Sequence, residues 1–275
     1  MSGTNDVDER STSRRRAVLL AVGGCGLALA VAGHGEPSMA IGVPGHRAPS
    51  FTLMQMNVCL SGFAGCFGRV AYPAGVDDAA ARIRAAHPDA VTVNEACQGD
   101  VAGIARKAGY HLRFSAVRTA AGPLRCVLPG GRGRFGDAVL TRAAVVRSDS
   151  HAFATQAGSE RRRWLCVTTR TNVDVCTAHL ATRSPVEVAG NDGQCAELAT
   201  ILARRMAARP VIFGGDVNRR RPCAPPGLWT RTDVSAGQAP SLQHAYGSPV
   251  FRSPAAHVVP AMYTDHDVLV IRAAG

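Results

Sequence analysis

The sequence predicts an α/β or α+β sandwich, and three observations favour this class. Short apolar runs rich in valine recur along the chain, and most are bounded by Gly, Pro, Asp or Arg, as β-strands commonly are. Segments with apolar residues at helical spacing lie between several of these runs. No repeat or low-complexity tract interrupts residues 41–275. Because strands predominate and helices are interspersed among them, a sandwich is favoured over a helical bundle or an all-β barrel.

The expected strands are short runs that stop at polar or turn-forming residues. A turn over Arg170–Asn172 predicts that the two runs flanking it pair as a hairpin. In chain order the strands are Phe51–Val58, Ala90–Val93, Ala138–Thr141, Trp164–Thr168, Val173–Thr177, Val211–Phe213 and Val268–Ile271.

Three helices are expected between these strands. Val76–Ala86 carries its apolar residues on one face, and it ends at His87-Pro88 because the residue before a proline avoids helical geometry. Asp100–Ala108 and Cys195–Ala208 show the same periodicity.

Residues 1–40 predict a secretory signal peptide rather than part of the fold. Arg14–Arg16 precede a neutral apolar run, Ala17–Ala32, and Ser38–Ala40 match the small-residue pattern of a cleavage site. The apolar run is shorter than the roughly 20 residues that span a bilayer, so we expect no stable membrane span. The remaining domain covers residues 41–275.

The sequence leaves the export route open. Ser13–Arg15 resembles a twin-arginine (Tat) signal, but Ala17 stands where that signal prefers an aromatic residue, so the general secretory (Sec) route is the alternative. Val22–Cys25 is similar to a lipobox, and lipoprotein anchoring at Cys25 is therefore an alternative to release. We expect a secreted, extracellular protein.

Cleavage after Ala40 leaves eight cysteines, and an even number predicts disulfides in an exported chain. The chain contains no Cys-x-x-Cys and no cysteine with a histidine at zinc-finger spacing, which argues against a structural zinc site. Proximity suggests one pair, the expected hairpin suggests a second, and the other four cysteines would then form two more. These pairs are Cys59–Cys66, Cys166–Cys176, Cys97–Cys126 and Cys195–Cys223.

The formal net charge of +11 favours polyanionic partners. Nucleic acid, anionic lipid surfaces and phosphorylated small molecules all fit, and a basic exoprotein with no such partner is the alternative. The sequence contains no Gly-x-Ser-x-Gly and no P-loop, so a serine-hydrolase elbow and an NTPase site are excluded.

Polar residues stand where the expected strands end, and this pattern carries the functional prediction. Four strands end in amide, acidic or imidazole side chains, whereas the last strand begins with such residues. If the last strand runs antiparallel to the others, all five segments meet at one rim. The residues are Asn57, Glu95, His179, Asp216 and Asn218, together with Asp265 and His266.

This set of side chains suits metal-assisted cleavage of phosphoesters. Mg²⁺ prefers oxygen ligands and keeps several waters beside one or two carboxylates, so Glu95 and Asp265 could hold it, with Asn57 adding an amide oxygen. Mn²⁺ or Ca²⁺ could substitute. A bound metal would stabilise charge on a phosphoryl oxygen or on the leaving group.

The remaining residues of this set are expected to act on the phosphate. His179 and His266 would flank it, one activating water and the other steadying or protonating the oxygens. Asp216 and Asn218 would orient the nucleophile or a second ligand.

With these residues identified, the chain resembles the endonuclease/exonuclease/phosphatase superfamily. The segments MQMN, TVNEAC, FGDAVLT, CTAHL, GGDVN and TDHD occur in the order of that family, from Asn57 almost to the C-terminus. The resemblance implies a two-sheet β-sandwich with helices packed on both outer faces, and metal-dependent cleavage of phosphoesters. It also implies that Glu95 and Asp265 bind metal, while His179, Asp216, Asn218 and His266 carry the reaction.

Two positions depart from the pattern of the family. Asp137 stands where many members carry asparagine, and it is expected to be a turn residue, with an acceptor role behind the site as the alternative. Gln243 stands where many members carry the aspartate that orients the final histidine. A neutral glutamine would hold an imidazole without favouring its protonated form. Asp233 or Asp267 could compensate.

The expected activity is that of an exported Mg²⁺-dependent phosphodiesterase, acting as a non-specific endonuclease or exonuclease on DNA or RNA. Arg219 and Arg220 follow Asn218 directly and are candidates for substrate binding, as is His244. A phospholipid, sphingomyelin or inositol-phosphate phosphoesterase is the first alternative, with Leu60–Phe67 as the nearest candidate for a membrane-docking hairpin. The second is a binding module of the same fold with weakened catalysis. We expect a monomer.

Overall fold

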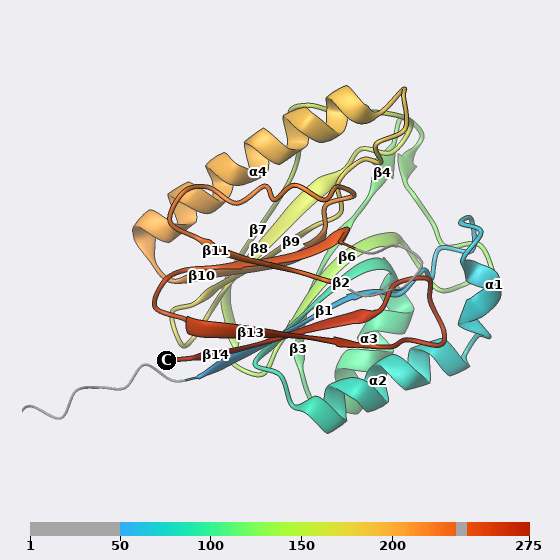
Figure 1. Ribbon diagram of the computed structural model, residues 1–275. Coiled ribbons are helices and arrows are strands. Elements are labelled where there is room, and N and C mark those ends of the chain that lie inside the picture. The colour runs from blue at the N-terminus through green and yellow to red at the C-terminus, as the bar shows by residue number, and fades with distance from the viewer. Residues whose placement is uncertain (1–49, 235–240) are drawn as a thin grey trace, which may run out of the picture. The chain divides into compact units, whose positions relative to one another are not determined.

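Two six-stranded mixed sheets form the centre of the domain in the computed structural model, which describes residues 50–234 and 241–275 (Figure 1). The first sheet has the order β13 (Arg252–Val259), β14 (Val268–Ala274), β1 (Phe51–Asn57), β2 (Ala90–Cys97), β6 (Phe135–Thr141) and β3 (His111–Ala116). The second has the order β11 (Trp229–Thr232), β12 (Gln243–Gly247), β10 (Val211–Asp216), β9 (Asp174–Ala178), β8 (Arg163–Thr169) and β7 (Val145–Ala152). A two-stranded ribbon joins β4 (Arg118–Thr119) and β5 (Gly122–Pro123).

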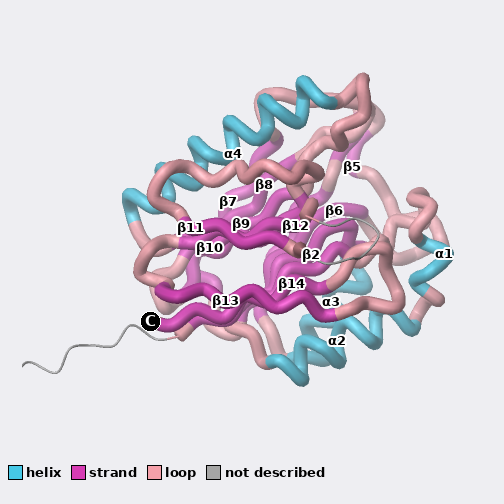
Figure 2. The backbone as a smooth tube through the Cα atoms, in the orientation of Figure 1, coloured by secondary structure: helices cyan, strands magenta, loops and turns pink. Residues whose placement is uncertain are grey.

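Helices cover the outer face of each sheet, as the strands and helices of Figure 2 show. The helix α4 (Val188–Ala208) packs on the second sheet, while α2 (Ala74–Ala86) and α3 (Gln98–Ala108) pack on the first; α1 (Phe67–Val70) is a short turn beside α2. Three separate hydrophobic clusters follow from this arrangement, one between the sheets and one beneath the helices on each side. The result is a four-layer α/β/β/α sandwich, which confirms the predicted fold class.

The side chains of β1 alternate between the two faces of the first sheet. In β1, Met54 and Met56 pack toward α2 and α3, whereas Phe51 and Leu53 belong to the cluster between the sheets. Side chains in a strand repeat with a period of two, so Gln55 and Asn57 lie on the same face as Leu53. The inter-sheet face of β1 is therefore apolar at its beginning and polar at its end.

The same change from apolar to polar occurs on the other inner strands. On the inter-sheet face, Ala90 of β2 and Ile212 of β10 are followed by polar or glycine positions along their strands. Every second residue along each strand lies on this face. In order, these are Ala90, Thr92 and Asn94 in β2; Val175 and Thr177 in β9, followed by His179; and Ile212, Gly214 and Asp216 in β10. One end of the sandwich is thus closed by hydrophobic packing, and the other end presents polar side chains between the sheets.

The direction of the last strand matches the expectation that placed Asp265 and His266 with the other strand ends. β14 pairs antiparallel with β1, and Gln55 lies opposite Leu269. β1 pairs in parallel with β2, and β10 pairs in parallel with β9. The hydroxyl group of Thr264 donates a hydrogen bond to the carbonyl oxygen of Asn57 at 2.9 Å. The start of β14 therefore lies beside the end of β1.

All seven expected strands and all three expected helices are present; most are longer than expected, whereas β1 ends one residue earlier and β9 is shifted by one residue. The hairpin of β8 and β9 is also present, with Cys166 opposite Cys176. Outer strands such as β3, β7, β11 and β13 were missed because they are partly exposed and contain no long run of apolar residues. The predicted signal peptide lies outside the described residues. No helix within residues 50–234 and 241–275 combines the length and the apolar character needed to span a bilayer.

The four disulfides form the pairs expected from the sequence. They join Cys59 to Cys66, Cys97 to Cys126, Cys166 to Cys176 and Cys195 to Cys223. Such bonds are maintained in oxidising compartments.

Candidate active site

The carboxylate of Asp216 lies at the centre of the residues that were expected to meet at the strand ends. Asp216 is the last residue of β10 and is 1% exposed. Its Oδ2 atom accepts a hydrogen bond from the amide of Asn57 at 3.1 Å and lies 3.4 Å from Nε2 of His266. Its Oδ1 atom accepts a hydrogen bond from the backbone N–H of Asn218 at 2.9 Å. The structure therefore brings β1, β10 and the start of β14 together at one carboxylate.

Asp216 is ionised in this environment. Burial is the largest influence on its pKa and opposes ionisation, but the neighbouring imidazole of His266 and the hydrogen bonds from Asn218 and Asn57 favour the carboxylate, and the pKa of Asp216 lies below its usual value. An anionic carboxylate fixed by several donors can accept a proton or orient a water molecule.

Glu95 reaches the site through an irregularity in β2. The pairing between β2 and β6 shifts register between Val93 and Ala96, and Glu95 lies within this bulge with a φ of 55°. A bulge turns a side chain away from its regular face, and a left-handed backbone at a residue other than glycine is a strained conformation that often accompanies function. Oε1 of Glu95 accepts a hydrogen bond from the amide of Asn57 at 2.9 Å. Burial is the main cause that raises the pKa of Glu95, and the charge of Asp216 raises it further.

His179 and Asn218 form a second pair beside Asp216. The backbone of His179 forms a parallel bridge to that of Asp216, and the side-chain amide of Asn218 lies 3.0 Å from Nε2 of His179. The same amide donates to the carbonyl oxygen of Leu180 at 2.9 Å, so Nε2 of His179 acts as the acceptor and Nδ1 carries the proton. Burial, together with the nearby guanidinium of Arg162, lowers the pKa of His179 to about 3. His179 is therefore a neutral donor at neutral pH.

His266 and Asp265 complete the site from the other side. His266 is 8% exposed, and its Nε2 atom lies 4.0 Å from the nearer carboxylate oxygen of Asp265. The Nδ1 atoms of both His179 and His266 are buried without a hydrogen-bond partner among the described residues. Buried polar atoms are rarely left without partners, so both rings present unused hydrogen-bonding capacity at the site.

A network of buried polar side chains supports the site from between the sheets. Oδ1 of Asn94 accepts the backbone N–H of Asp216 at 2.9 Å and the amide of Gln55 at 2.8 Å, which ties β2 and β1 to β10. Thr92 donates to Gln55 at 2.6 Å. This network was not predicted from the sequence, although the polar positions on the face of Leu53 were a signal for it.

Asp137 is part of this network, and its assignment to a turn was wrong. It lies within β6, is 2% exposed, and accepts a hydrogen bond from the amide of Asn94 at 2.9 Å. Burial raises the pKa of Asp137 to about 7. The alternative role as an acceptor behind the site is the one that fits, because Asp137 orients the residue that holds the backbone of Asp216.

Gln243 does not contact His266 through any hydrogen bond of the described residues. Its amide nitrogen donates to Asp233 at 3.2 Å and to the carbonyl oxygen of Asp267 at 2.6 Å, and its oxygen accepts from Gln55 at 3.3 Å. Gln243 therefore joins the network between the sheets and holds the segment that carries His266 through its backbone. The side chain of Asp267 accepts the N–H of Ala261 and does not compensate for the missing acid.

The three substrate-binding candidates occupy different environments. Arg219 is half-buried and Arg220 is exposed, directly after Asn218. His244 is fully buried, and its two ring nitrogens lie 2.9 Å from the hydroxyl of Tyr246 and 3.2 Å from the carbonyl oxygen of Ser241. The structure does not bring His244 to the surface with the other candidates. Arg162, which sequence reasoning missed, is 9% exposed and acts on the charges of Glu95 and His179.

The donor set suits a hard divalent cation. Glu95 and Asp265 offer carboxylate oxygens and both residues are partly exposed, so water could complete the coordination shell of a cation held by them. The amide oxygen of Asn57 accepts the backbone N–H of Cys59 at 3.2 Å, and its nitrogen faces the carboxylates, so Asn57 contributes here as a donor that positions Glu95 and Asp216. The only three-residue group of His, Cys, Asp or Glu ligand atoms in the described chain includes two cysteines that are joined in a disulfide.

The fold and this site together define a two-sheet sandwich whose polar strand ends form a candidate hydrolytic centre. The chain belongs to the Endonuclease/Exonuclease/phosphatase family, whose model matches residues 55–266. This match confirms the resemblance drawn from the sequence motifs.

Solved structures with the same fold share little sequence with this chain. Truncated Caenorhabditis elegans TDP2 has a TM-score of 0.61 at 15% identity, with 82% of this chain and 98% of that chain covered. TDP2 from D. rerio, in complex with a single-strand DNA product, has a TM-score of 0.58 at 15% identity, with 81% and 98% covered. Sphingomyelinase C from Streptomyces griseocarneus has a TM-score of 0.55 at 17% identity, with 82% and 99% covered. Among curated proteins, no sequence matched the chain.

Proposed function

We propose that this protein is an exported, Mg²⁺-dependent phosphodiesterase that hydrolyses DNA or RNA without sequence preference. The observation that carries the proposal is the buried carboxylate of Asp216, which lies 3.4 Å from Nε2 of His266 and shares the amide group of Asn57 with Glu95. Membership of the Endonuclease/Exonuclease/phosphatase family supports the reaction class. The predicted signal peptide and the four disulfides support export.

The role of each group in the reaction follows from its position and its hydrogen bonds. Asp216 accepts the proton of the attacking water, because its carboxylate is anionic and is held by Asn218 and Asn57. His179 donates from Nδ1 to a phosphoryl oxygen, because its Nε2 is occupied by Asn218. His266, beside Asp216, donates to another phosphoryl oxygen or to the leaving group. Donors fixed in advance around developing negative charge account for much of the rate enhancement in such sites.

Glu95 and Asp265 would hold the cation, with Asn57 keeping Glu95 in place. A divalent cation bound there would neutralise charge on a phosphoryl or leaving oxygen. Binding would also favour the ionised form of Glu95, whose pKa is raised by burial in the metal-free protein.

The substrate assignment rests on charge. The net charge of +11 attracts a phosphate backbone, and contacts of this kind weaken as salt rises. The chain contains only two Trp, four Tyr and eight Phe residues, so extensive base stacking is not expected. The structure of D. rerio TDP2, which has the same fold and is complexed with a single-strand DNA product, supports this assignment.

A lipid phosphodiester is the second candidate, and one surface feature favours it. Phe63, Val127 and Leu128 are 55%, 40% and 56% exposed, respectively. The backbone N–H of Val127 donates to the carbonyl oxygen of Ser61 at 3.0 Å, so these apolar residues belong to two adjoining loops. Exposed apolar side chains on loops next to a phosphoester site could dock on a bilayer.

The experiment compares substrates and metal conditions. The purified mature protein is incubated with plasmid DNA, RNA and sphingomyelin vesicles, with Mg²⁺ or with chelator, beside the variants Asp216→Asn and Asp77→Asn. We expect nicking of nucleic acid that requires metal and falls about 10²–10⁴-fold in Asp216→Asn. Asp77→Asn makes the same chemical change at an exposed ion pair with Lys107 and should retain activity. Calorimetric titration of Mg²⁺ into wild type and Glu95→Gln provides a readout that does not depend on turnover.

Each alternative predicts a different result. Cleavage of sphingomyelin alone would replace the nucleic-acid assignment by the lipid one. Metal-independent nicking that survives in Asp216→Asn would refute the proposed mechanism. Absence of turnover on every substrate would favour a binding module of the same fold.

A further inference from the structure

A basic pocket opens beside Asn218, outside the residues to which the reaction is assigned. It has a volume of about 580 Å³ and is lined by Arg183, Arg219, Arg220, Arg221 and Asp192, with Asn218 and Leu242 completing the wall. Four arginines and one aspartate give this lining a strong positive charge. Because Asn218 belongs both to this wall and to the hydrogen-bonded pair with His179, the pocket adjoins the reacting site.

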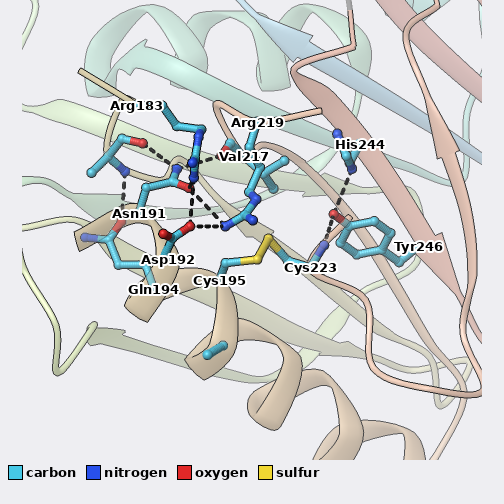
Figure 3. Close-up of a disulfide and its surroundings, with 12 residues drawn as sticks. Arg183, Asn191, Asp192, Gln194, Cys195, Val217, Arg219, Cys223, His244 and Tyr246 are labelled. Atoms are coloured by element: carbon cyan, nitrogen blue, oxygen red, sulfur yellow. Dashed lines mark hydrogen bonds and ion pairs between the residues drawn. A yellow bond between two sulfur atoms is a disulfide. The ribbon is translucent and has the colours of Figure 1, made fainter. Parts of the chain in front are cut away.

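Asn191 accepts hydrogen bonds from two of the arginines that line this pocket. It is fully buried, and its amide nitrogen donates to the carbonyl oxygens of Ala181 at 2.6 Å and Val217 at 2.9 Å. Its side-chain oxygen accepts from Nη1 of Arg183 at 3.4 Å and from Nη1 of Arg219 at 3.2 Å. A single buried amide therefore ties together the segments after β9 and β10 and the arginines that they carry (Figure 3).

Asp192 holds the same two arginines at the surface. Its Oδ1 atom lies 2.7 Å from Nη1 of Arg183 and 2.8 Å from Nη1 of Arg219. One carboxylate thus serves two guanidinium groups, and it uses only one terminal nitrogen of each. Nη2 of Arg183 and Nη2 of Arg219 make no hydrogen bond within the described part of the chain. Both arginines keep donors that match the oxygens of a phosphate.

A disulfide and a buried tyrosine fix the far end of the arginine loop. Cys223, two residues after Arg221, is joined to Cys195 in α4, one turn beyond Asn191 and Asp192. The N–H of Cys223 donates to the hydroxyl of Tyr246 at 2.9 Å, and that hydroxyl lies 2.9 Å from Nδ1 of His244 (Figure 3). Both ends of the loop from Asn218 to Cys223 are anchored, so its arginines face a preformed pocket. This arrangement also gives His244 a role in supporting the loop.

We propose that this pocket is a second phosphate subsite, in which Arg183, Arg219 and Arg220 bind the phosphate next to the scissile one along a nucleic-acid strand. This inference rests on the proposed phosphodiesterase function and narrows its substrate class. A strand offers consecutive phosphates, whereas a phosphodiester with a single phosphate leaves the pocket empty. The subsite therefore favours a strand with at least two phosphates over a lipid headgroup that carries one.

The test compares substrates that differ by one phosphate. The specificity constant kcat/KM is measured for the dinucleotide TpT and the trinucleotide TpTpT, with wild type, Arg183→Gln, Arg220→Gln and Arg204→Gln. Arg204 is an exposed arginine twelve residues beyond Asp192 in α4, so its replacement removes the same charge away from the pocket. We expect wild type and Arg204→Gln to prefer TpTpT. Arg183→Gln and Arg220→Gln should each lower the ratio of TpTpT to TpT about tenfold, the loss expected for one charge-assisted contact.

A binding measurement separates this inference from the proposed function. Inorganic pyrophosphate is titrated calorimetrically into the same four proteins with chelator present. Weaker binding in Arg183→Gln than in Arg204→Gln is expected. If no nucleic acid is cleaved while this difference persists, the phosphodiesterase assignment fails and the pocket instead binds a phosphorylated small molecule. If nucleic acid is cleaved but the TpTpT to TpT ratio is the same in all four proteins, the second subsite is refuted. Equal pyrophosphate binding by all four proteins would contradict it as well.

Discussion

Replacing Asp137 by asparagine should change the pH dependence of stability. The free energy of unfolding of the variant, minus that of wild type, should increase as pH rises. Asp137 lies within β6, is 2% exposed, and its Oδ2 atom has no hydrogen-bond partner among the described residues. Burial raises the pKa of Asp137 from 3.8 to about 7; the charges of Glu95 and Glu160 add to this, and Asn94 and Arg162 oppose it. The asparagine side chain has the same shape and does not ionise.

The sign of the effect follows from the raised pKa. The folded protein binds the proton of Asp137 more tightly than the unfolded chain does, so ionisation destabilises the fold as pH rises from about 4 to about 7. Between pH 5 and pH 8 this linkage amounts to about 2–3 kcal/mol. Asp137→Asn lacks this linkage, so its free energy of unfolding minus that of wild type should increase by about 2–3 kcal/mol over the same interval.

Equilibrium unfolding in urea at pH 5 and pH 8 measures this difference. Chelator is present throughout, because a ligand that binds only the folded state would add stability of its own. Asp77→Asn is the control, since the side chain of Asp77 is 57% exposed. The reasoning is refuted if the stability difference between Asp137→Asn and wild type stays constant between the two pH values, or if it decreases toward pH 8.

Three further predictions concern the site and its support. Gly214→Ala should lower the free energy of unfolding by about 1–3 kcal/mol, because a Cβ atom there would lie 2.3 Å from Oγ1 of Thr92 in the closely packed inter-sheet region; Gly65→Ala, with nothing within 4 Å, is the control in the same urea assay. Replacing Cys195 and Cys223 together by alanine should cost about 3–4 kcal/mol of unfolding free energy, since the bond closes a loop between residues 28 positions apart, and thermal and urea unfolding that match wild type would contradict this. His179→Gln should lower kcat/KM about 10²–10⁴-fold without moving the acid limb of the pH–rate profile, because the pKa of His179 is about 3 and its ring is already neutral above pH 5; a shifted acid limb would show that His179 titrates in the working range.

The strand ends could be predicted because an apolar run followed by a polar residue is visible in local sequence. Asp216 and His179 stand at the ends of buried apolar runs, and Asp265 precedes one. The sequence therefore predicted that these residues lie at the ends of strands. The cysteine pairs could also be predicted from local sequence. One pair is close in sequence, and a second lies across a predicted hairpin.

The supporting residues could not be predicted because their roles depend on the opposite sheet. Gln55 and Asn94 are single polar residues inside strands, and only the pairing of the sheets shows that they bond to each other and to the backbone of Asp216. Asp137 was expected to be a turn residue, and aspartate is common in turns, whereas the structure places it inside β6, where its carboxylate accepts a hydrogen bond from the amide of Asn94. The bulge that directs Glu95 into the site also depends on the partner strand β6.

Because the inter-sheet face changes from apolar to polar along each inner strand, the register of these strands determines whether the site can form. In β1, Leu53 belongs to the hydrophobic cluster, while Gln55 and Asn57 on the same face bind the polar network and the two carboxylates. A shift of β1 by two residues would keep each side chain on its own face, yet it would move Asn57 by about 7 Å, which is longer than any of its hydrogen bonds. Insertions and deletions of an even number of residues within the inner strands would therefore leave the fold able to form but would abolish activity. Homologous chains should tolerate length changes in their loops far more readily than in β1, β2, β9 and β10.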